Sequence, residues 1–347
     1  MTAKVVILNW NGEKFLSKFL YSVVESLPQG VGVVVADNGS TDNSKFTVEM
    51  FNAAPDIELE VEWLPLGENF GFAEGYNRAL ARIEADVYVL LNSDVEPQKG
   101  WLDPLLIYLE EHDDVAAVQP KILSYDHPDH FEYAGAAGGF VDRFGYPFCR
   151  GRIMQTTEKD EGQYDDVREV FWASGACMAI TAEAYRRAGG LDGDFFAHME
   201  EIDLCWRLQL MGWKVAVVPQ GVVRHVGGGT LPNNSPMKIY LNFRNSLCML
   251  HKCLPKSGLW RLKVRRWMDI LSCVVYRLSG QKEFAKQVLR AHDDYKTLRP
   301  ALDAKREAVL REAVVLEPPT IWRGWIVWRY MLGRQKSFKG IVIGNKK

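Results

Sequence analysis

The chain has 347 residues, of which 47% are hydrophobic and 25% charged, a balance that excludes a disordered or fibrous protein. The formal net charge of −2 conceals two oppositely charged parts. Residues 1–236 hold 18 basic and 36 acidic side chains, whereas residues 237–347 hold 24 basic and 8 acidic ones. This asymmetry indicates that the basic part meets an anionic membrane or a nucleic acid, or packs on the acidic part.

Four further features narrow the class of protein. The length allows roughly two domains. No apolar run approaches the roughly 18 residues of a membrane span, since the best candidates, near Val274 and Ile326, are interrupted by Arg. The start, Met1–Leu8, is typical of a strand and lacks the pattern of a signal peptide. The six cysteines show no C-x-x-C spacing, which predicts reduced thiols in a cytoplasmic protein.

The first hundred residues alternate between strand and helix patterns. Strands are predicted at 4–9, 31–36, 60–64 and 87–91, and amphipathic helices at 13–27 and 73–83. Continuous apolar strands separated by helices are typical of βαβ units. They predict an α/β fold with a mainly parallel sheet covered by helices on both faces.

Polar clusters follow three of these strands, at the edge where such sheets bind ligands. The clusters are Asn9 with Asn11, Asp37 with Asn38 and Ser40, and Asn92 with Ser93 and Asp94. Each is also ordinary turn or helix-capping chemistry, but their convergence on one edge predicts a binding site. Because the chain has no P-loop, and no G-x-G-x-x-G after its first strand, a nicotinamide-binding Rossmann protein is disfavoured.

Two further clusters extend the predicted site. Asp94 ends its strand where a carboxylate can bind Mg²⁺ or Mn²⁺ together with substrate phosphates. The segment 192–207 opens a helix with Glu200, Glu201 and Asp203, which are either N-terminal acids favoured by the helix dipole or candidates for a general base. Strand patterns at 215–218 and 222–225 then lead through His225 into the glycine-rich segment 227–230.

Taken in series, the motifs resemble those of glycosyltransferase family 2, the inverting transferases with the GT-A fold that use nucleotide-diphospho-sugars. Within the family, the chain is most similar to bacterial rhamnosyltransferase-like enzymes of surface polysaccharide synthesis. The motifs span roughly residues 4–230. They are Val6–Gly12, Val35–Asp42, Glu68–Asn77, Leu90–Asp94, Ser174–Cys177 and Glu200–Arg207.

The resemblance implies a role for each matching residue. The donor nucleotide would contact Asp37, which matches the carboxylate that recognises the base, and its neighbours Asn9, Asn11, Asn38, Ser40, Asn69, Gly71, Asn77, Asn92 and Ser93. Asp94 and His225 would hold a divalent metal, Mg²⁺ or Mn²⁺. Glu201 would be the catalytic base, with Asp203 and Glu200 as alternatives.

At two positions the chain departs from the family pattern. Asn92 replaces the first carboxylate of the D-x-D metal motif, which removes a charge from the metal site. Glu201 stands where the family usually has Asp, which lengthens the reach of the carboxylate by one methylene. These departures keep open the alternative of a non-catalytic nucleotide-sugar-binding subunit or scaffold in a polysaccharide assembly complex. A nucleotidyltransferase is less favoured, because such enzymes carry a phosphate loop rich in Gly, Arg and Lys near their start.

The implied reaction is transfer of a sugar, with rhamnose the leading hypothesis, to a hydroxyl of a glycan or lipid-linked acceptor. The implied mechanism is a single in-line displacement at the anomeric carbon. We therefore predict a catalytic domain over residues 1–236, followed by a basic, mainly helical extension over 237–347.

The basic extension interleaves Trp and Tyr with Arg and Lys at 260–267 and 321–330. This composition suits the headgroup region of an anionic membrane, and a lipid-linked acceptor would place the protein at the inner face of the cell membrane. The alternative is that the Trp residues pack helices onto the catalytic domain. We expect no nucleic acid partner, since no recognition motif accompanies the charges.

Overall fold

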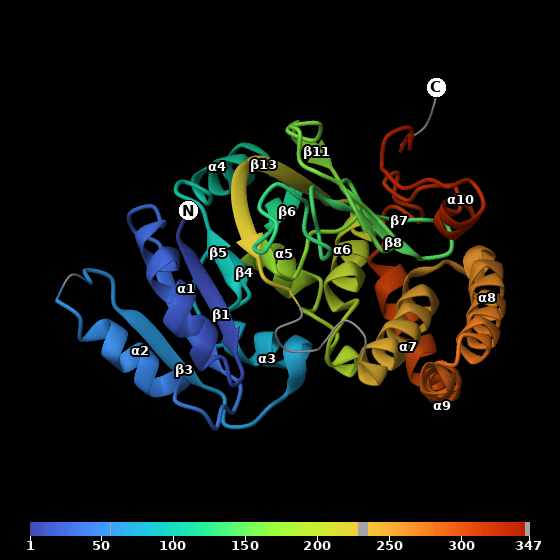
Figure 1. The fold of residues 1–347 in the computed structure, drawn as a ribbon, viewed down its shortest axis with the longest axis horizontal. Coiled ribbons are helices and arrows are strands. Elements are labelled where there is room, and N and C mark those ends of the chain that lie inside the picture. Colours follow the sequence, from blue (N-terminus) through green and yellow to red (C-terminus); the bar gives the residue numbers. More distant parts are fainter. Residues whose placement is uncertain (56, 228–234, 344–347) are drawn as a thin grey trace.

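The structure is a computed structural model, which describes residues 1–55, 57–227 and 235–343 (Figure 1). The first part runs in the order β1 (Ala3–Asn9), α1 (Glu13–Glu25), β2 (Gly32–Asp37), α2 (Ser44–Asn52), β3 (Val61–Pro65), α3 (Gly71–Leu80), β4 (Val87–Leu91), β5 (Val95–Pro97), α4 (Asp103–Glu111) and β6 (Val115–Ser124). The middle part contains β7 (Gly139–Val141), β8 (Pro147–Cys149), β9 (Arg152–Ile153), β10 (Thr156–Thr157), β11 (Arg168–Glu169), β12 (Cys177–Thr181), α5 (Ala182–Arg187), α6 (Glu200–Leu210) and β13 (Lys214–His225). The last part contains α7 (Pro236–Cys253), α8 (Leu259–Leu278), α9 (Lys282–Arg311) and α10 (Ile326–Met331).

The main sheet has the strand order β11-β13-β6-β12-β4-β1-β2-β3, with β5 paired to β13 beside this path. Strands β1 to β4 are parallel to their neighbours in the order β4-β1-β2-β3, as predicted. Strand β12 then inserts antiparallel between β4 and β6, so the sheet is mixed beyond β4. The patterns at 215–218 and 222–225 belong to one strand, β13, whose pairing with β6 shifts register between Val217 and Val222.

Successive residues of the central strands feed two different cores, which explains why those strands are apolar throughout. In β1, Val5 and Ile7 face the core covered by α1, α2 and α4, whereas Val6 faces the core covered by α3, α5 and α6. All three side chains are at most 1% exposed. Helices therefore cover both faces of the sheet, which confirms the predicted α/β class.

The basic extension begins with α7 and packs on the rest of the chain. Beyond α9 the chain returns to the small sheet β10-β9-β8-β7, where the Trp322 N–H donates to the Val141 carbonyl at 2.9 Å. Phe338 packs on Phe140 and Phe148 there, and all of these aromatic side chains belong to the core beneath α3 and α6. The hydrophobic core is thus continuous across residues 236 and 237, where the sequence predicts a domain boundary. That boundary stays a prediction.

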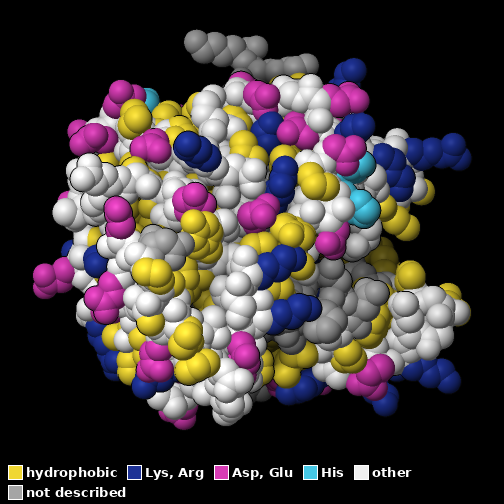
Figure 2. All heavy atoms as spheres, turned by 60° about the vertical axis from the view of Figure 1, so that its left-hand side comes forward, with side chains coloured by type: hydrophobic (Ala, Val, Ile, Leu, Met, Phe, Trp, Pro, Cys, Tyr) yellow, Lys and Arg dark blue, Asp and Glu magenta, His cyan; other side chains and the backbone are white. Residues whose placement is uncertain are grey.

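Two expectations from composition can be compared with the described residues. None of the helices there is both long and apolar enough to cross a bilayer. All six cysteines lie in the described part of the chain, where each is buried and free of disulfides. On the face drawn in Figure 2, acidic, basic and hydrophobic side chains are interspersed.

Candidate active site

The ends of β1 and β2 bring the first predicted donor-binding residues together. Asn9 and Asp37 are paired in register, and the Asn9 amide donates to Ser40 Oγ at 3.0 Å. Both oxygens of Asp37 accept from the Ser40 N–H at 3.3 Å, which fixes the turn. The Asn9 side-chain oxygen is buried and accepts no hydrogen bond, so it is available to a ligand donor.

Asn11 supports the same turn from the loop after β1. Its N–H donates to Ser40 Oγ at 2.9 Å, and its side-chain oxygen accepts from the Thr41 N–H at 2.7 Å. Its φ of 51° lies in the left-handed region, which Asn adopts more readily than most residues. Asn11 therefore shapes the rim of the strand-end cluster.

Asn38 joins the end of β2 to the loop before α3. Its amide donates to Asn69 Oδ1 at 3.2 Å and to the Gly71 carbonyl at 3.0 Å, and its oxygen accepts from the Phe70 N–H at 3.1 Å. Gly71 has a φ of 77°, and a Cβ there would lie 2.4 Å from the ring of Phe196. Only glycine lets this loop approach the segment before α6.

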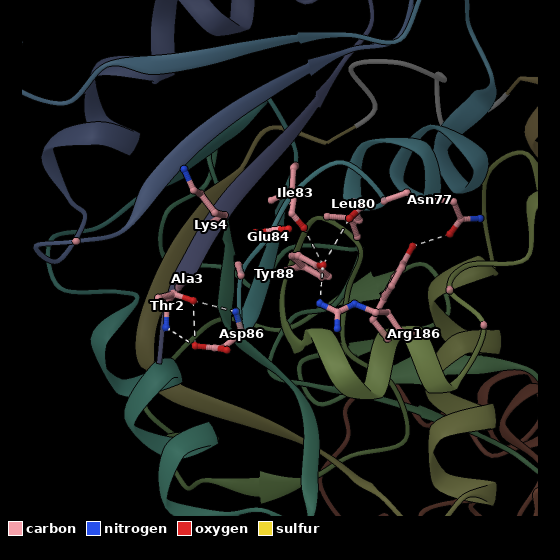
Figure 3. Close-up of a pocket in the computed structure, with 16 residues that line it drawn as sticks. Thr2, Ala3, Lys4, Asn77, Leu80, Ile83, Glu84, Asp86, Tyr88 and Arg186 are labelled. Atoms are coloured by element: carbon pink, nitrogen blue, oxygen red, sulfur yellow. Dashed lines mark hydrogen bonds between the residues drawn. The ribbon is translucent and has the colours of Figure 1, made fainter.

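Asn77 is placed differently from the other predicted donor-binding residues. Its oxygen accepts from the Tyr185 hydroxyl at 2.7 Å and the Leu191 N–H at 3.0 Å, and its amide donates to the Leu191 carbonyl at 2.8 Å. Because it lies well into α3, it contacts α5 and Leu191 and lines a cavity away from the strand-end cluster (Figure 3).

That cavity, of about 1200 Å³, lies at the amino ends of β1 and β4. Figure 3 shows several of its polar groups bonded to one another, whereas the side chains of Lys4 and Glu84 carry no such bond. The Thr2 N–H and hydroxyl donate to Asp86 at 2.8 and 2.9 Å, and Arg186 donates to the Tyr88 hydroxyl at 3.2 Å. Their hydrogen bonds are satisfied within the protein, and the cavity lies at the edge of the sheet opposite the predicted site.

Asp94 and His225 meet at the ends of β4 and β13, as predicted for a shared site. Asp94 follows β4, His225 ends β13, and His225 Nε2 lies 3.1 Å from Asp94 Oδ1. Glu132 lies on the other edge of the imidazole, 3.4 Å from Nδ1. All three side chains are buried, at 7%, 5% and 7% exposure for Asp94, His225 and Glu132 respectively.

Asp94 and His225 shift each other's protonation, and Glu132 adds to the shift of His225. Burial lowers the pKa of His225, but the charges of Glu132 and Asp94 outweigh it and raise that pKa to about 10. Burial raises the pKa of Asp94, yet the charge and hydrogen bond of His225 leave it below its usual range. A cation bound between Asp94 and Nε2 would replace the proton that now links them.

Among the described residues, no group of three or more His, Cys, Asp or Glu side chains is placed to hold a metal ion. Asp94 lies beside Nε2 of His225, whereas Glu132 lies beside Nδ1 on the other edge of the ring. One cation could therefore be bound by Asp94 and Nε2, but not by Glu132 as well. One carboxylate and one imidazole, completed by substrate phosphates, fit the requirements of Mg²⁺ or Mn²⁺. Residues 228–230 of the glycine-rich segment lie outside the described residues.

Backbone contacts connect this pair to the predicted base. The Asn92 N–H donates to the Ala176 carbonyl at 2.9 Å. A Cβ on the adjacent Gly175 would lie 3.3 Å from the ring of Phe72 and 3.8 Å from Glu201 Cβ, so this segment lies close to the start of α6. Ser93 lies on the other side, where a Cβ on Gly12 would be 3.5 Å from its hydroxyl.

Glu200 and Glu201 open α6 with buried carboxylate oxygens. One oxygen of each, Oε2, is buried and makes no hydrogen bond. Burial raises the pKa of Glu201 more than the backbone N–H groups at the helix start lower it. Burial also raises the pKa of Glu200, and the neighbouring charge of Glu201 raises it further. A carboxylate with a raised pKa and a free oxygen has the properties of a general base.

Asp203, the third carboxylate of this helix, is engaged elsewhere. It is fully buried, and its Oδ2 accepts from Arg207 Nε and from Lys252 Nζ, both at 2.8 Å. Lys252 belongs to α7 and also binds Asp192 at 2.6 Å. Of the three predicted candidates for the base, only Glu200 and Glu201 therefore keep an unpaired oxygen.

The segment 195–199, which precedes these carboxylates, has a strained backbone and is held in place by hydrogen bonds from α7. Phe196, His198 and Met199 have φ values of 63°, 68° and 74°, in the left-handed region that favours glycine. The fully buried amide of Asn245 donates to the carbonyls of Phe195, Ala197 and His198 at 3.0, 2.9 and 2.7 Å.

The same strained segment contacts the loop before α3. The Phe196 carbonyl accepts from the Phe72 and Ala73 N–H groups at 2.6 and 3.2 Å. Arg244, next to Asn245, donates to the carbonyls of Asp194 and Phe195 at 2.8 and 3.0 Å. Helix α7 thus fixes both the start of α6 and its contact with the predicted donor loop.

Sequence analysis missed Glu132 and the role of Asn245. Glu132 lies in a loop with no motif, and only the fold brings it to His225, so no local signal could have found it. Asn245 stands in the run 240–245, where an Arg-Asn pair in an otherwise apolar helix pattern was a detectable signal of a buried polar contact.

The family model described as "Glycosyl transferase family 2" matches residues 4–186. Among curated proteins, the N-acetylglucosaminyl-diphospho-decaprenol L-rhamnosyltransferase of Mycobacterium tuberculosis is 26% identical over 275 residues, covering 75% of this chain and 87% of that protein. The low-salt glycan biosynthesis hexosyltransferase Agl10 of Haloferax volcanii is 22% identical over 260 residues, covering 73% of this chain and 76% of that protein.

Solved structures support the same fold. S. aureus TarS 1-349 in complex with UDP-GlcNAc superimposes with a TM-score of 0.57 at 16% identity, covering 99% of both chains. The mannosyltransferase PcManGT from Pyrobaculum calidifontis, in complex with GDP-Man and Mn²⁺, has a TM-score of 0.51 at 15% identity, covering 89% of this chain and 85% of that one. The predicted GT-A fold is confirmed.

The raised pKa of Glu200 predicts that Glu200→Gln stabilises the protein at alkaline pH. In the unfolded state Glu200 loses its proton at about pH 4.3, as a free Glu does. In the folded state it keeps the proton to higher pH. The free energy of unfolding of wild type therefore falls as the pH rises through this window. The free energy of unfolding of the variant should exceed that of wild type by about 1–3 kcal/mol above neutral pH and by less in acid. Chemical denaturation at several pH values measures this. The exposed Glu183→Gln is the control, and an equal effect at all pH values would contradict the prediction.

The hydrogen bonds that Asn245 donates predict that Asn245→Ala slows turnover and also weakens donor binding, because the segment they hold bonds to the predicted donor loop. Loss of the donated hydrogen bonds should cost about 1–3 kcal/mol of stability, and the displaced carboxylates should lower kcat by about 10- to 100-fold. Turnover and donor affinity are measured well below both melting temperatures. Asn242→Ala is the matched control, because the Asn242 amide donates only within its own helix, to the Lys238 carbonyl at 2.9 Å. Unchanged kcat in Asn245→Ala would mean that the hydrogen bonds of Asn245 contribute only to the stability of the protein.

Proposed function

The chain belongs to glycosyltransferase family 2, and we propose that it is an inverting enzyme that transfers a sugar from a nucleoside diphosphate to an acceptor hydroxyl. The leading hypothesis for the sugar is rhamnose, and for the acceptor a hydroxyl of a glycan or a lipid-linked saccharide in surface polysaccharide synthesis. The similarity to the mycobacterial rhamnosyltransferase supports this choice.

One observation carries the proposal. The buried Asp94–His225 pair lies at the ends of β4 and β13. A second pair, Glu200 and Glu201, opens α6, and the Gly175 segment next to the end of β4 lies close to Glu201. Each of these two glutamates has a buried Oε2 that makes no hydrogen bond. The first pair suits a cation and a departing diphosphate, and the second pair suits proton removal. A single displacement needs these two functions on opposite sides of one anomeric carbon.

In the proposed mechanism, Glu201 removes the proton from the acceptor hydroxyl as the oxygen attacks the anomeric carbon. Its pKa, which burial raises, strengthens it as a base. Asp94 and His225 would hold a divalent metal, which when bound offsets the negative charge that develops on the leaving diphosphate. Glu132 orients the imidazole from its other edge, and Asn92 would hydrogen-bond the donor ribose without adding charge.

Donor recognition is assigned to the cluster at the ends of β1 and β2. Asp37 would accept from the pyrimidine base, with Asn9, Asn11 and Ser40 around it. The free buried oxygen of Asn9 is a second acceptor for the nucleotide. Asn38, Asn69 and Gly71 would shape the loop that covers the nucleotide, since their side chains and backbone are already bonded to one another.

A lipid-linked acceptor would place the reaction at a membrane. The name of the mycobacterial relative describes a decaprenol-linked acceptor, and a similar acceptor here would be reached at the inner face of the cell membrane. Peripheral contact with anionic lipid would then be made by the basic part of the chain.

Glu201→Gln is expected to lower transfer by about 100- to 10,000-fold, because it removes the proton acceptor while preserving shape. Donor affinity should stay within about twofold of wild type, since the substitution removes a charge that does not contact the nucleotide. Release of nucleoside diphosphate upon adding acceptor measures transfer, and isothermal titration measures donor binding. Glu183→Gln is the control. Full turnover by Glu201→Gln would remove Glu201 from the base role, and donor bound by wild type but never consumed would favour a non-catalytic subunit.

Asp94→Asn is expected to abolish the metal dependence of nucleotide binding. A thermal-shift panel of UDP, GDP and dTDP sugars, each with Mn²⁺ or with chelator, should show a shift in wild type that depends on metal. The variant should show the same small shift under both conditions, and its turnover should fall on the order of 100-fold. A metal-dependent shift that persists in Asp94→Asn would place the cation elsewhere.

A further inference from the structure

Helix α8 presents an apolar face to solvent along its whole length. The exposed side chains on this face, called here the α8 face, are Trp260, Trp267, Leu271, Val274, Val275 and Leu278. Their spacing of three, four and seven residues places them in one stripe on the helix. Trp267 is 61% exposed and Leu278 is 84% exposed. Such exposure of neighbouring large hydrophobic side chains is unusual unless the surface binds a partner. The helix lies at the end of the molecule opposite α2 (Figure 1).

The charges of α8 are of one sign wherever they reach solvent. Lys263 and Arg277 are exposed beside the stripe. Asp269 is the single acidic residue of α8, and it is fully buried, bound by Arg265 at 2.8 Å and by His292 at 3.2 Å. The most exposed side chains of α8 are therefore all apolar or cationic, a combination typical of helices that lie in the headgroup layer of a membrane.

A second apolar patch continues the α8 face. Trp328, Met331 and Leu332, at and just beyond the end of α10, are all more than half exposed. Trp328 stacks on Trp325, whose ring packs against Phe144 at 5.2 Å, and Phe144 in turn packs against Trp260 at 6.1 Å. This line of rings joins the two patches.

We propose that the α8 face and the adjoining α10 patch dock the enzyme on an anionic lipid bilayer. This deepens the proposed function, since it rests on a lipid-linked acceptor and names the surface that meets the membrane. Charge complementarity favours lipid over a second copy of the chain, because two copies joined by this face would oppose their cationic rims. Tryptophan at the edges and aliphatic side chains between them match the chemistry of the lipid interface.

The test is flotation of the full chain with phosphatidylcholine vesicles, with and without phosphatidylglycerol, at low and high salt. Wild type should float with the anionic vesicles and less so at high salt. The variant Trp267→Glu/Leu278→Glu should lose binding by at least about 100-fold, from loss of two apolar contacts. Lys263→Gln/Arg277→Gln should lose about fivefold for each cation removed, only with anionic vesicles.

The matched control is Phe46→Glu/Met50→Glu on α2, because Phe46 and Met50 are 60% and 55% exposed at the opposite end of the molecule. This control should float as wild type does. Wild type that fails to float, equal losses in the face and control variants, or a face variant that only converts a dimer to a monomer would each overturn the proposal.

Transfer to a water-soluble acceptor analogue, assayed on the same preparations, tests the proposed function separately. The α8 face variant should lose vesicle binding and keep this activity. Vesicle binding without any transfer by wild type would support the docking surface and count against the proposed function alone.

Discussion

The contact on which the rest of the site depends is made by one buried amide. Asn245 of α7 donates to three carbonyls of the segment 195–198, in which two of the three residues from 196 to 198 have left-handed backbone. Each such residue costs on the order of 1–3 kcal/mol and persists only when its surroundings hold it. This segment positions Glu200 and Glu201 and also bonds to the start of α3. The predicted donor loop and base are therefore coupled through a helix that lies outside the matched family region of residues 4–186.

The same dependence explains part of the charge asymmetry between residues 1–236 and 237–347. Lys252 binds Asp192 and Asp203, and Lys305 binds Asp192 and Asp194 at 2.6 and 2.7 Å, so cations of the second part neutralise carboxylates of the first around the start of α6. Packing of the two parts accounts for these charges. It does not account for the exposed cations of α8, which we assign to the membrane. Packing and membrane contact, posed as alternatives by the sequence, thus involve different basic residues.

The sequence predicted best the positions of polar residues that stand at or just after the end of a strand. Parallel register brings Asn9 beside Asp37, and the end of β4 brings Asp94 to the same edge, so an apolar run followed by a polar residue was a sufficient signal. Residues on helices were harder, because Asn77 and Asp203 share their motifs with site residues but turn towards Leu191 and Lys252. Glu132 was beyond reach, because only the fold brings it to His225. Asn245 was marked by an Arg-Asn pair, but that signal does not say which carbonyls it binds.

The central claim is that the diphosphate and its cation bind between Asp94 and His225, beside Glu201. The most direct measurement is a crystal structure of the full chain grown with Mn²⁺ and a nucleoside diphosphate, with the anomalous scattering of manganese recorded. We expect one strong anomalous peak within coordinating distance of Asp94 and His225, in contact with the diphosphate, and the base beside Asp37. A manganese peak elsewhere, or a nucleotide bound in the cavity at the amino ends of β1 and β4, would contradict the account.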